Sequence, residues 1–152
     1  MILMKKRALQ RTIIIKANQP FNIKYGHWLF MNYDKLCKDV LELEPQIRFA
    51  GIYTDSGDIK GVGLRENVKS LLNPEESKMS LYYSSHRWKT GKTLSYRMGK
   101  EKYSITEFEK VKLISIPIAD KHLLLLSTEP TVDHDSIIKG IFKLIETHSK
   151  ES

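Results

Sequence analysis

The chain has 152 residues, of which 41% are apolar and 28% charged, as in an ordinary globular protein of one domain. Its longest apolar runs, residues 28–31 and 123–126, are far shorter than the ~20 residues that cross a bilayer, which excludes a membrane-spanning helix. The single cysteine, Cys37, excludes an internal disulfide framework and a cysteine-only metal site. Since no Asn-x-Ser/Thr sequon occurs either, we expect a cytoplasmic protein.

The net charge of +7 is concentrated at the N-terminus, where residues 1–30 hold six basic side chains and no acidic one. Residues 31–152 are nearly neutral, so we divide the chain into a basic N-terminal leader, residues 1–30, and a domain at residues 31–150. A basic leader can bind nucleic acid. The candidate contacts are Lys5, Lys6, Arg7 and Arg11. The alternatives are a membrane-surface tether, a targeting sequence, an unstructured leader, or a functional start at Met31.

The domain begins with a helix and a hairpin. Asn32 is a suitable N-cap, apolar residues follow at helical spacing, and Pro45 closes the segment. Cys37 lies on the apolar stripe, which favours a small core residue over a reactive thiol. Residues 47–53 and 59–64 predict two strands joined by a tight turn. Gly61 and Gly63 in the second strand indicate either a bulge or a close approach of another backbone.

A second helix is predicted from Asn73, where a cap, a proline and two acids follow one another. Its apolar residues recur three or four positions apart to about Arg97, before Gly99, with a break expected if Gly91 interrupts it. This spacing predicts that Tyr83 faces the core, while Arg87 and Lys89 lie toward water. The aromatic and basic residues at 82–89 fit either an amphipathic helix or a surface that stacks on nucleic-acid bases.

The last third of the chain predicts three strands and a helix. The strand patterns at 103–108, 111–118 and 122–126 are separated by only a few residues, so they form an antiparallel meander. The final helix begins near Asp133 and carries one apolar stripe. The resulting fold class is α+β in the order α-β-β-α-β-β-β-α, with a five-stranded antiparallel sheet. One sheet face is expected beneath the first and last helices, and the other against the second helix or a partner.

Several segments resemble motifs of enzymes or metal sites, but none has the residues that the motif requires at the required spacing. Residues 90–93 match the last residues of a phosphate-binding loop, but His86 stands at the position where that loop requires its first glycine. Residues 61–66 place Glu66 where a dinucleotide fingerprint needs glycine. No histidine pair has zinc-ligand spacing, residues 55–58 do not match a calcium loop, and no serine lies in a Gly-x-Ser-x-Gly frame. We therefore expect no enzyme, no metal and no cofactor.

The predicted elements resemble the roadblock/LC7 group within the profilin-like and longin-like folds. The resemblance is carried by residues 103–109, the strand at 111–118 with its apolar-proline-apolar end, the turn at 119–121, and the leucine-rich strand at 122–127. Residues 51–57 resemble the first hairpin of that group. With residues 99–103, the chain is also similar to an uncharacterised archaeal family of this size. The resemblance implies no catalytic residues. It implies dimerisation through the second helix or a sheet edge, and a regulatory role beside Ras-like GTPases or motor complexes.

The leading hypothesis is a non-enzymatic, homodimeric interaction or regulatory module. Aromatic residues and methionine are enriched at interface cores. The interface candidates are therefore Met79, Tyr82, Tyr83, His86 and Trp88. Two alternatives remain: a sensory domain that binds a small molecule between sheet and helices, and a nucleic-acid-binding protein that uses its leader.

Overall fold

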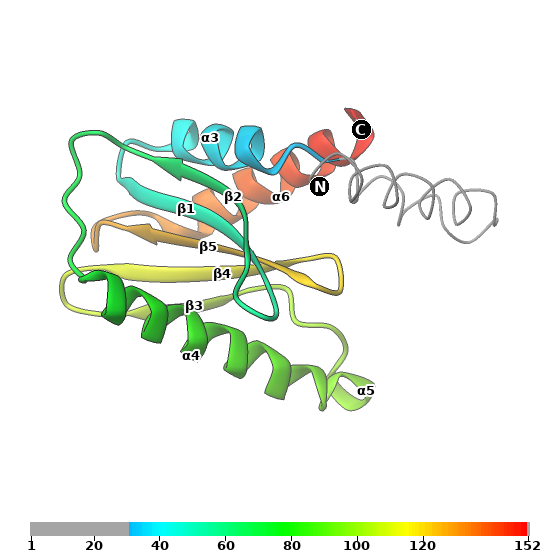
Figure 1. The fold of residues 1–152 in the computed structure, drawn as a ribbon. Coiled ribbons are helices and arrows are strands. Elements are labelled where there is room, and N and C mark those ends of the chain that lie inside the picture. The colour runs from blue at the N-terminus through cyan, green and yellow to red at the C-terminus, as the bar shows by residue number, and fades with distance from the viewer. Residues whose placement is uncertain (1–30, 152) are drawn as a thin grey trace, which may run out of the picture.

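The computed structural model describes residues 31–151 and has the predicted order of elements (Figure 1). The elements are α3 (Tyr33–Leu43), β1 (Ile47–Thr54), β2 (Ile59–Leu64), α4 (Pro74–Lys92), α5 (Ser95–Met98), β3 (Ser104–Glu107), β4 (Lys112–Ile118), β5 (His122–Thr128) and α6 (His134–Glu151). The short helix α5 is the one addition. The leader at residues 1–30, with the candidate contacts Lys5, Lys6, Arg7 and Arg11, lies outside the described residues.

The five strands form one antiparallel sheet in the order β2-β1-β5-β4-β3, which confirms the predicted fold class. The meander β3-β4-β5 is present, and β5 continues into the first hairpin by pairing with β1. Leu126 is the register partner of both Ala50 on β1 and Ile114 on β4. Because side chains alternate along each strand, this register gathers the largest aliphatic residues on one face of the sheet.

That aliphatic face lies beneath α3 and α6, and the core of the domain sits between them (Figure 1). Helix α3 contributes a stripe at helical spacing that includes Leu36, Val40 and Leu41, and α6 contributes Ile137, Ile138, Ile141 and Ile145. The predicted first and last helices therefore cover the expected face. Phe142 of α6 is 38% exposed, and its ring lies beside that of Tyr103.

Local signals in the first third of the domain are confirmed. The Asn32 side chain accepts a hydrogen bond from the Lys35 N–H at 3.0 Å and caps α3. Gly57 turns the β1–β2 hairpin with a φ of +88°, a conformation that glycine adopts without strain. Cys37 is fully buried, and burial raises the pKa of its thiol to about 12, so the residue packs the core as predicted.

Both explanations of the glycines in β2 apply. The register between β1 and β2 shifts opposite Ile52 and Tyr53, which is a bulge beside Gly61. Helix α3 also approaches β2 closely, since a Cβ on Gly61 would lie 2.7 Å from the backbone carbon of Tyr33. The Asp34 side chain accepts a hydrogen bond from the Val62 N–H at 3.1 Å and fixes the same contact. Glycine in β2 therefore sets the distance between α3 and the sheet.

Helix α4 lies against the opposite face of the sheet, but its orientation differs from the prediction. Tyr83 is 65% exposed, and the buried residues of α4 are Ser85 and Trp88. Arg87 is half-buried and points to the sheet side, where we had expected water. The helix also ends at Lys92, and α5 begins at Ser95 after a break just beyond Gly91. The apolar spacing had therefore identified the outer face of α4.

The attachment of α4 to the sheet depends on a few side chains. Trp88 is 2% exposed but is not part of the main core cluster. Arg87 donates to Glu101 at 2.5 Å and to the Ser115 hydroxyl of β4 at 3.0 Å. Lys92 lies 3.7 Å from the centroid of the Trp88 ring and donates to the carbonyl of Asp120. One tryptophan and two tethered cations thus hold the helix in place.

The close approach of α3 to β2 predicts a contrast between two glycines. Gly61→Ala should destabilise the domain by about 1–3 kcal/mol, because the new Cβ meets the backbone of α3. Gly91→Ala has nothing within 4 Å of its Cβ and should stabilise α4 by up to about 1 kcal/mol. Urea unfolding followed by circular dichroism measures both values. Equal effects of the two substitutions would contradict the packing of α3 on β2.

The tethering of α4 predicts a local effect of one arginine. Arg87→Ala leaves Glu101 and the buried Ser115 without their charged partner and should cost about 1–3 kcal/mol. Hydrogen exchange followed by mass spectrometry should show faster exchange at residues 74–98, with β1 and β5 unchanged. Lys78→Ala, on an exposed position of the same helix, is the matched control and should change stability by less than about 0.5 kcal/mol. Uniformly faster exchange over the whole domain would rule out a local role.

Candidate interaction surface

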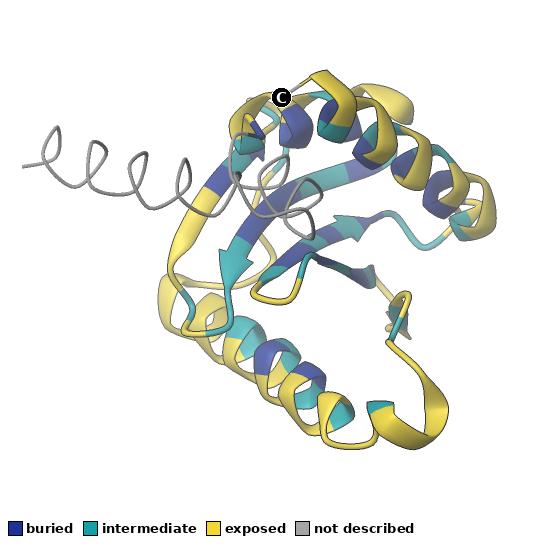
Figure 2. Cartoon of the chain, turned by 90° about the vertical axis from the view of Figure 1, so that its right-hand side faces the viewer, coloured by how far each residue is buried: buried dark blue, intermediate teal, exposed yellow. Residues whose placement is uncertain are grey.

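The outward side of α4 carries large side chains that no part of the described chain covers. Met79 is 70% exposed, Tyr82 71% and Tyr83 65%, and His86 is exposed beside them. The rings of Tyr82 and His86 are stacked, with centroids 5.9 Å apart and an interplanar angle of 12°. We name these four residues the α4 face. Figure 2 shows the outward side of this helix as a run of exposed positions.

Trp88, the fifth interface candidate, is not on the α4 face. It is buried between α4 and the sheet, where Lys92 lies over its ring. Four of the five candidates are thus brought together on one side of a helix, and the fifth anchors the opposite side. The spacing in the sequence is consistent with this separation, because Trp88 lies three residues from Ser85 and seven from Leu81, which places all three on one face of a helix. In the structure Ser85 is buried and Leu81 is half-buried.

The N-terminal end of α4 is fixed by capping. The Asn73 side chain accepts from the Glu76 N–H, and the Glu76 carboxylate accepts from the Asn73 N–H, each at 2.9 Å. Pro74 occupies the first turn, and the acids Glu75 and Glu76 complement the positive end of the helix dipole. The helix therefore begins at a defined residue, which gives the α4 face a rigid support.

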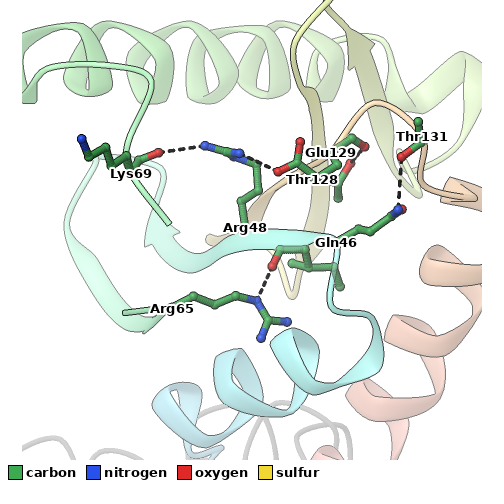
Figure 3. Close-up of polar contacts among 8 residues, drawn as sticks. Gln46, Arg48, Arg65, Lys69, Thr128, Glu129 and Thr131 are labelled. Carbon is green, nitrogen blue, oxygen red and sulfur yellow. Dashed lines mark hydrogen bonds and ion pairs between the residues drawn. The ribbon is translucent and has the colours of Figure 1, made fainter. Parts of the chain in front are cut away.

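Polar contacts at the end of the sheet fix the connection that leads from β2 to α4 (Figure 3). Arg48 on β1 donates to Glu129 at 2.6 Å and to the Lys69 carbonyl at 2.8 Å. Arg65 donates to the Ile47 carbonyl at 2.6 Å and also caps the end of α3 through the carbonyls of Leu41 and Glu44. These arginines bind backbone carbonyls and carboxylates of the chain itself, so the cluster has a structural role.

A second group of exposed apolar residues lies at the far end of α4, on α5 and the turn before it. Leu94 is 47% exposed, Tyr96 77% and Met98 72%. Leu94 and Met98 continue the apolar spacing of the predicted second helix, but both residues lie beyond the end of α4 and are exposed. The helix ends at Lys92. Beyond it, the N–H groups of Thr93 and Leu94 bond to the carbonyls three residues earlier, those of Thr90 and Gly91, which forms a tighter turn.

Two buried polar side chains on the sheet and on α4 are Lys112 and Ser85. Lys112 is buried, and its ammonium group donates to the Val132 carbonyl at 2.9 Å beside His134 Nδ1 at 3.1 Å. The chain thus satisfies this lysine internally. The Ser85 hydroxyl is buried without a hydrogen-bond partner. No group of three or more possible metal ligands occurs in the described part of the chain.

The rejected sequence motifs occupy ordinary elements of structure. Residues 61–64 are strand residues of β2, and residues 90–92 are the last turn of α4, preceded by helix and not by a strand. None of the helices between residues 31 and 151 is long and apolar enough to cross a membrane. The feature that stands out is the exposed apolar surface on α4, and such surfaces commonly mark binding sites for other macromolecules.

Solved structures with a similar fold include roadblock/LC7 domains. The chain is similar to the roadblock/LC7 domain from Streptomyces avermitilis, with a TM-score of 0.60, 15% identity, and coverage of 75% of this chain and 92% of that one. It is similar to MglB from Myxococcus xanthus, with a TM-score of 0.62, 10% identity, and coverage of 80% and 94%. For profilin II from Acanthamoeba castellanii the TM-score is 0.50, the identity 10%, and the coverage 79% and 98%. These likenesses show the fold alone.

Comparisons of sequence identify the family. No curated protein matches the chain. A profile described as "Family of unknown function (DUF6659)" matches residues 27–152, which include the whole described domain. The chain therefore belongs to the DUF6659 family and folds as a roadblock/LC7-like α+β domain.

Proposed function

We propose that residues 31–150 form a non-enzymatic regulatory module that works as a homodimer through the α4 face. The observation that carries the proposal is the exposure of Met79, Tyr82 and Tyr83 on a helix that capping and Arg87 hold rigidly to the sheet. Methionine and tyrosine are enriched in the cores of protein interfaces. The fold supports the same proposal, because a solved structure of MglB is described as having a tetrameric arrangement.

Charge along α4 favours an antiparallel pairing of two copies. The first turn carries Glu75 and Glu76, and the last turn carries Lys89 and Lys92. Around a two-fold axis, each residue i of one copy that contacts residue j of the other is matched by the reverse contact. Antiparallel α4 helices therefore place the acidic end of each helix near the basic end of its partner, with the α4 faces between them. The opposed helix dipoles favour the same direction.

A protein partner other than a second copy of the chain is a separate proposal. The roadblock resemblance implies a Ras-like GTPase, and we propose such a protein as the second partner, to be tested by a pull-down from native cell extract. The cytoplasmic location stays a prediction that rests on the single cysteine and the missing sequon. The division into a leader at 1–30 and a domain at 31–150 is likewise a proposal.

The homodimer makes a prediction for solution. Light scattering during size-exclusion chromatography should give the mass of a dimer for the full chain at tens of micromolar protein. Tyr82→Glu/Tyr83→Glu buries charge in the contact and should weaken association by about 30-fold or more. Ile59→Glu/Leu64→Glu, two residues that are 65% and 72% exposed on β2, is the matched control and should leave the mass unchanged. A clean monomer for the unmodified chain would overturn the proposal.

The antiparallel arrangement makes a second prediction. Glu75→Lys alone and Lys89→Glu alone should each weaken the dimer, because each places like charges near one another across the two-fold axis. The double variant restores opposite charges and should regain affinity. Glu75 is chosen because Glu76 belongs to the capping box of α4. Additive losses in the double variant would exclude this direction of pairing, although the α4 face itself would remain in place.

The two alternatives have their own measurements. A sensory domain would show a ligand-dependent rise in melting temperature when a small-molecule library is screened, and the unpaired Ser85 hydroxyl between α4 and the sheet is where a polar group would bind. Nucleic-acid binding through the leader would show salt-dependent DNA binding that falls in the variant Lys5→Gln/Lys6→Gln/Arg7→Gln/Arg11→Gln. If light scattering shows a monomer, a ligand-dependent rise in melting temperature would favour the sensory domain, and leader-dependent DNA binding would favour the nucleic-acid-binding protein, over the proposed homodimer.

A further inference from the structure

The exposed apolar group at the end of α4 is separate from the α4 face. The side chains of Leu94, Tyr96 and Met98 are 47%, 77% and 72% exposed. We name these three residues the α5 tip. In Figures 1 and 2, α5 lies at the far end of α4, where the chain turns back toward β3. The tip therefore forms a projecting corner of the described domain.

Basic residues surround the α5 tip. The segment from Arg87 to Lys102 contains six basic side chains and one acidic side chain, whereas the rest of residues 31–152 holds four more acidic than basic side chains. The basic residues are Arg87, Lys89, Lys92, Arg97, Lys100 and Lys102. Glu101, the one acid, is paired with Arg87. Arg97 lies over the ring of Tyr96, with its guanidinium carbon 5.3 Å from the ring centroid.

The neighbouring turns change this balance only slightly. Asp120, on the β4–β5 turn, lies 3.5 Å from Lys100, but both side chains are largely exposed, and Lys121 follows it. An exposed ion pair of this kind is weak and leaves Lys100 able to contact another anion. Arg97, Lys100 and Lys102 thus remain as exposed cations beside the apolar tip. A surface that combines both features fits a partner with an anionic outer layer and an apolar interior.

An anionic bilayer has this combination of layers. Tyrosine is favoured at the level of the lipid headgroups, and lysine and arginine bind anionic headgroups while their stems lie along apolar chains. A nucleic acid would bind the cations and stack on Tyr96, but it has no place for Leu94 and Met98. A protein partner would need a groove shaped to a projecting corner, whereas a bilayer surface accepts a convex one.

We propose that the α5 tip docks the domain on anionic membrane surfaces, with Leu94, Tyr96 and Met98 entering the headgroup region and Arg97, Lys100 and Lys102 binding the lipid phosphates and carboxylates. The docking is peripheral and reversible, since three side chains bury little apolar area and the cations are screened by salt. It goes beyond the proposed dimer, because the α5 tip and the α4 face share no residue.

Co-sedimentation of the full chain with vesicles tests the docking. Vesicles of phosphatidylcholine with about 30% phosphatidylserine should bind the protein, and vesicles of phosphatidylcholine alone should not. Binding should fall as salt is raised from about 0.1 M to about 0.5 M. The variants Leu94→Ser/Tyr96→Ser/Met98→Ser and Arg97→Glu/Lys100→Glu/Lys102→Glu should each weaken binding by about tenfold or more.

Each of these variants has a matched control. Ile59→Ser/Leu64→Ser removes two exposed apolar side chains from β2, and Lys38→Glu/Lys139→Glu/Lys143→Glu makes the same charge change on α3 and α6, at the opposite face of the sheet. Both controls should change vesicle binding by no more than about twofold. Circular dichroism of every variant should match the unmodified chain, so that loss of folding is separated from loss of docking.

Insertion is measured directly with Tyr96→Trp. Lipids brominated near the headgroup should quench the new fluorescence on phosphatidylserine vesicles, measured as the difference from the unmodified chain, which already contains Trp28 and Trp88. The same change at an exposed residue of the α4 face, Tyr83→Trp, should show little quenching. Equal quenching at both positions would overturn the assignment to the α5 tip, and so would no quenching at Tyr96→Trp.

Three further outcomes would overturn the proposal. Vesicle binding that survives both tip variants and disappears with Lys5→Gln/Lys6→Gln/Arg7→Gln/Arg11→Gln would assign the membrane contact to the leader. Loss of duplex DNA binding in the tip variants, without loss of vesicle binding, would assign a nucleic acid. A monomer in light scattering for Leu94→Ser/Tyr96→Ser/Met98→Ser would place the tip in the homodimer contact. Failure of the dimer through Tyr82 and Tyr83 alone would lower the affinity for vesicles but leave the effects of the tip variants and of Tyr96→Trp in place.

Discussion

Burial of one aliphatic face of the sheet beneath α3 and α6 is the constraint on which the rest of this structure depends. The register brings Ala50, Ile114 and Leu126 to that face, and both helices are complementary to it. The main core cluster contains residues from α3, the sheet, α6 and their immediate flanks, but none from α4 or α5. The hydrophobic stabilisation of the domain is thus concentrated on one side, where burying each large aliphatic side chain contributes about 1.5–3 kcal/mol.

Helix α4 contributes no residue to the main core cluster, so its role in the domain differs from that of α3 and α6. A helix that does not supply the core can carry apolar residues outward, provided that polar contacts and a single large anchor hold it in register. Trp88 is that anchor. Arg87 connects the helix to β4 through Ser115 and to the segment before β3 through Glu101. The layer between α4 and the sheet holds this tryptophan together with the buried Ser85 and the half-buried Arg87, and none of the three belongs to the main core cluster.

Sequence patterns predicted the core side well and the α4 side poorly, for the same physical reason. Apolar periodicity identifies the buried face of a helix when burial selects apolar residues, as it does for Leu36 and Val40 in α3 and Ile141 in α6. In α4 the buried positions include a serine, and a salt-bridged arginine lies half-buried beside them, while Met79 and Tyr83 are exposed. Spacing alone therefore selected the wrong face. The break that Gly91 allowed is present, but its position beyond Lys92 was hard to predict, because Thr93 and Leu94 are tolerated in a helix and only the backbone turn shows it.

The α5 tip lies on the turn and short helix that directly follow α4, and this links the two proposals physically. If two copies pair through antiparallel α4 helices, their α5 tips lie at opposite ends of the paired helices, and each tip remains free. Two weak membrane contacts on one dimer bind more tightly than either alone, because the second contact forms at a high effective concentration. Association through the α4 face would then control docking through the α5 tip without any change in the tip itself.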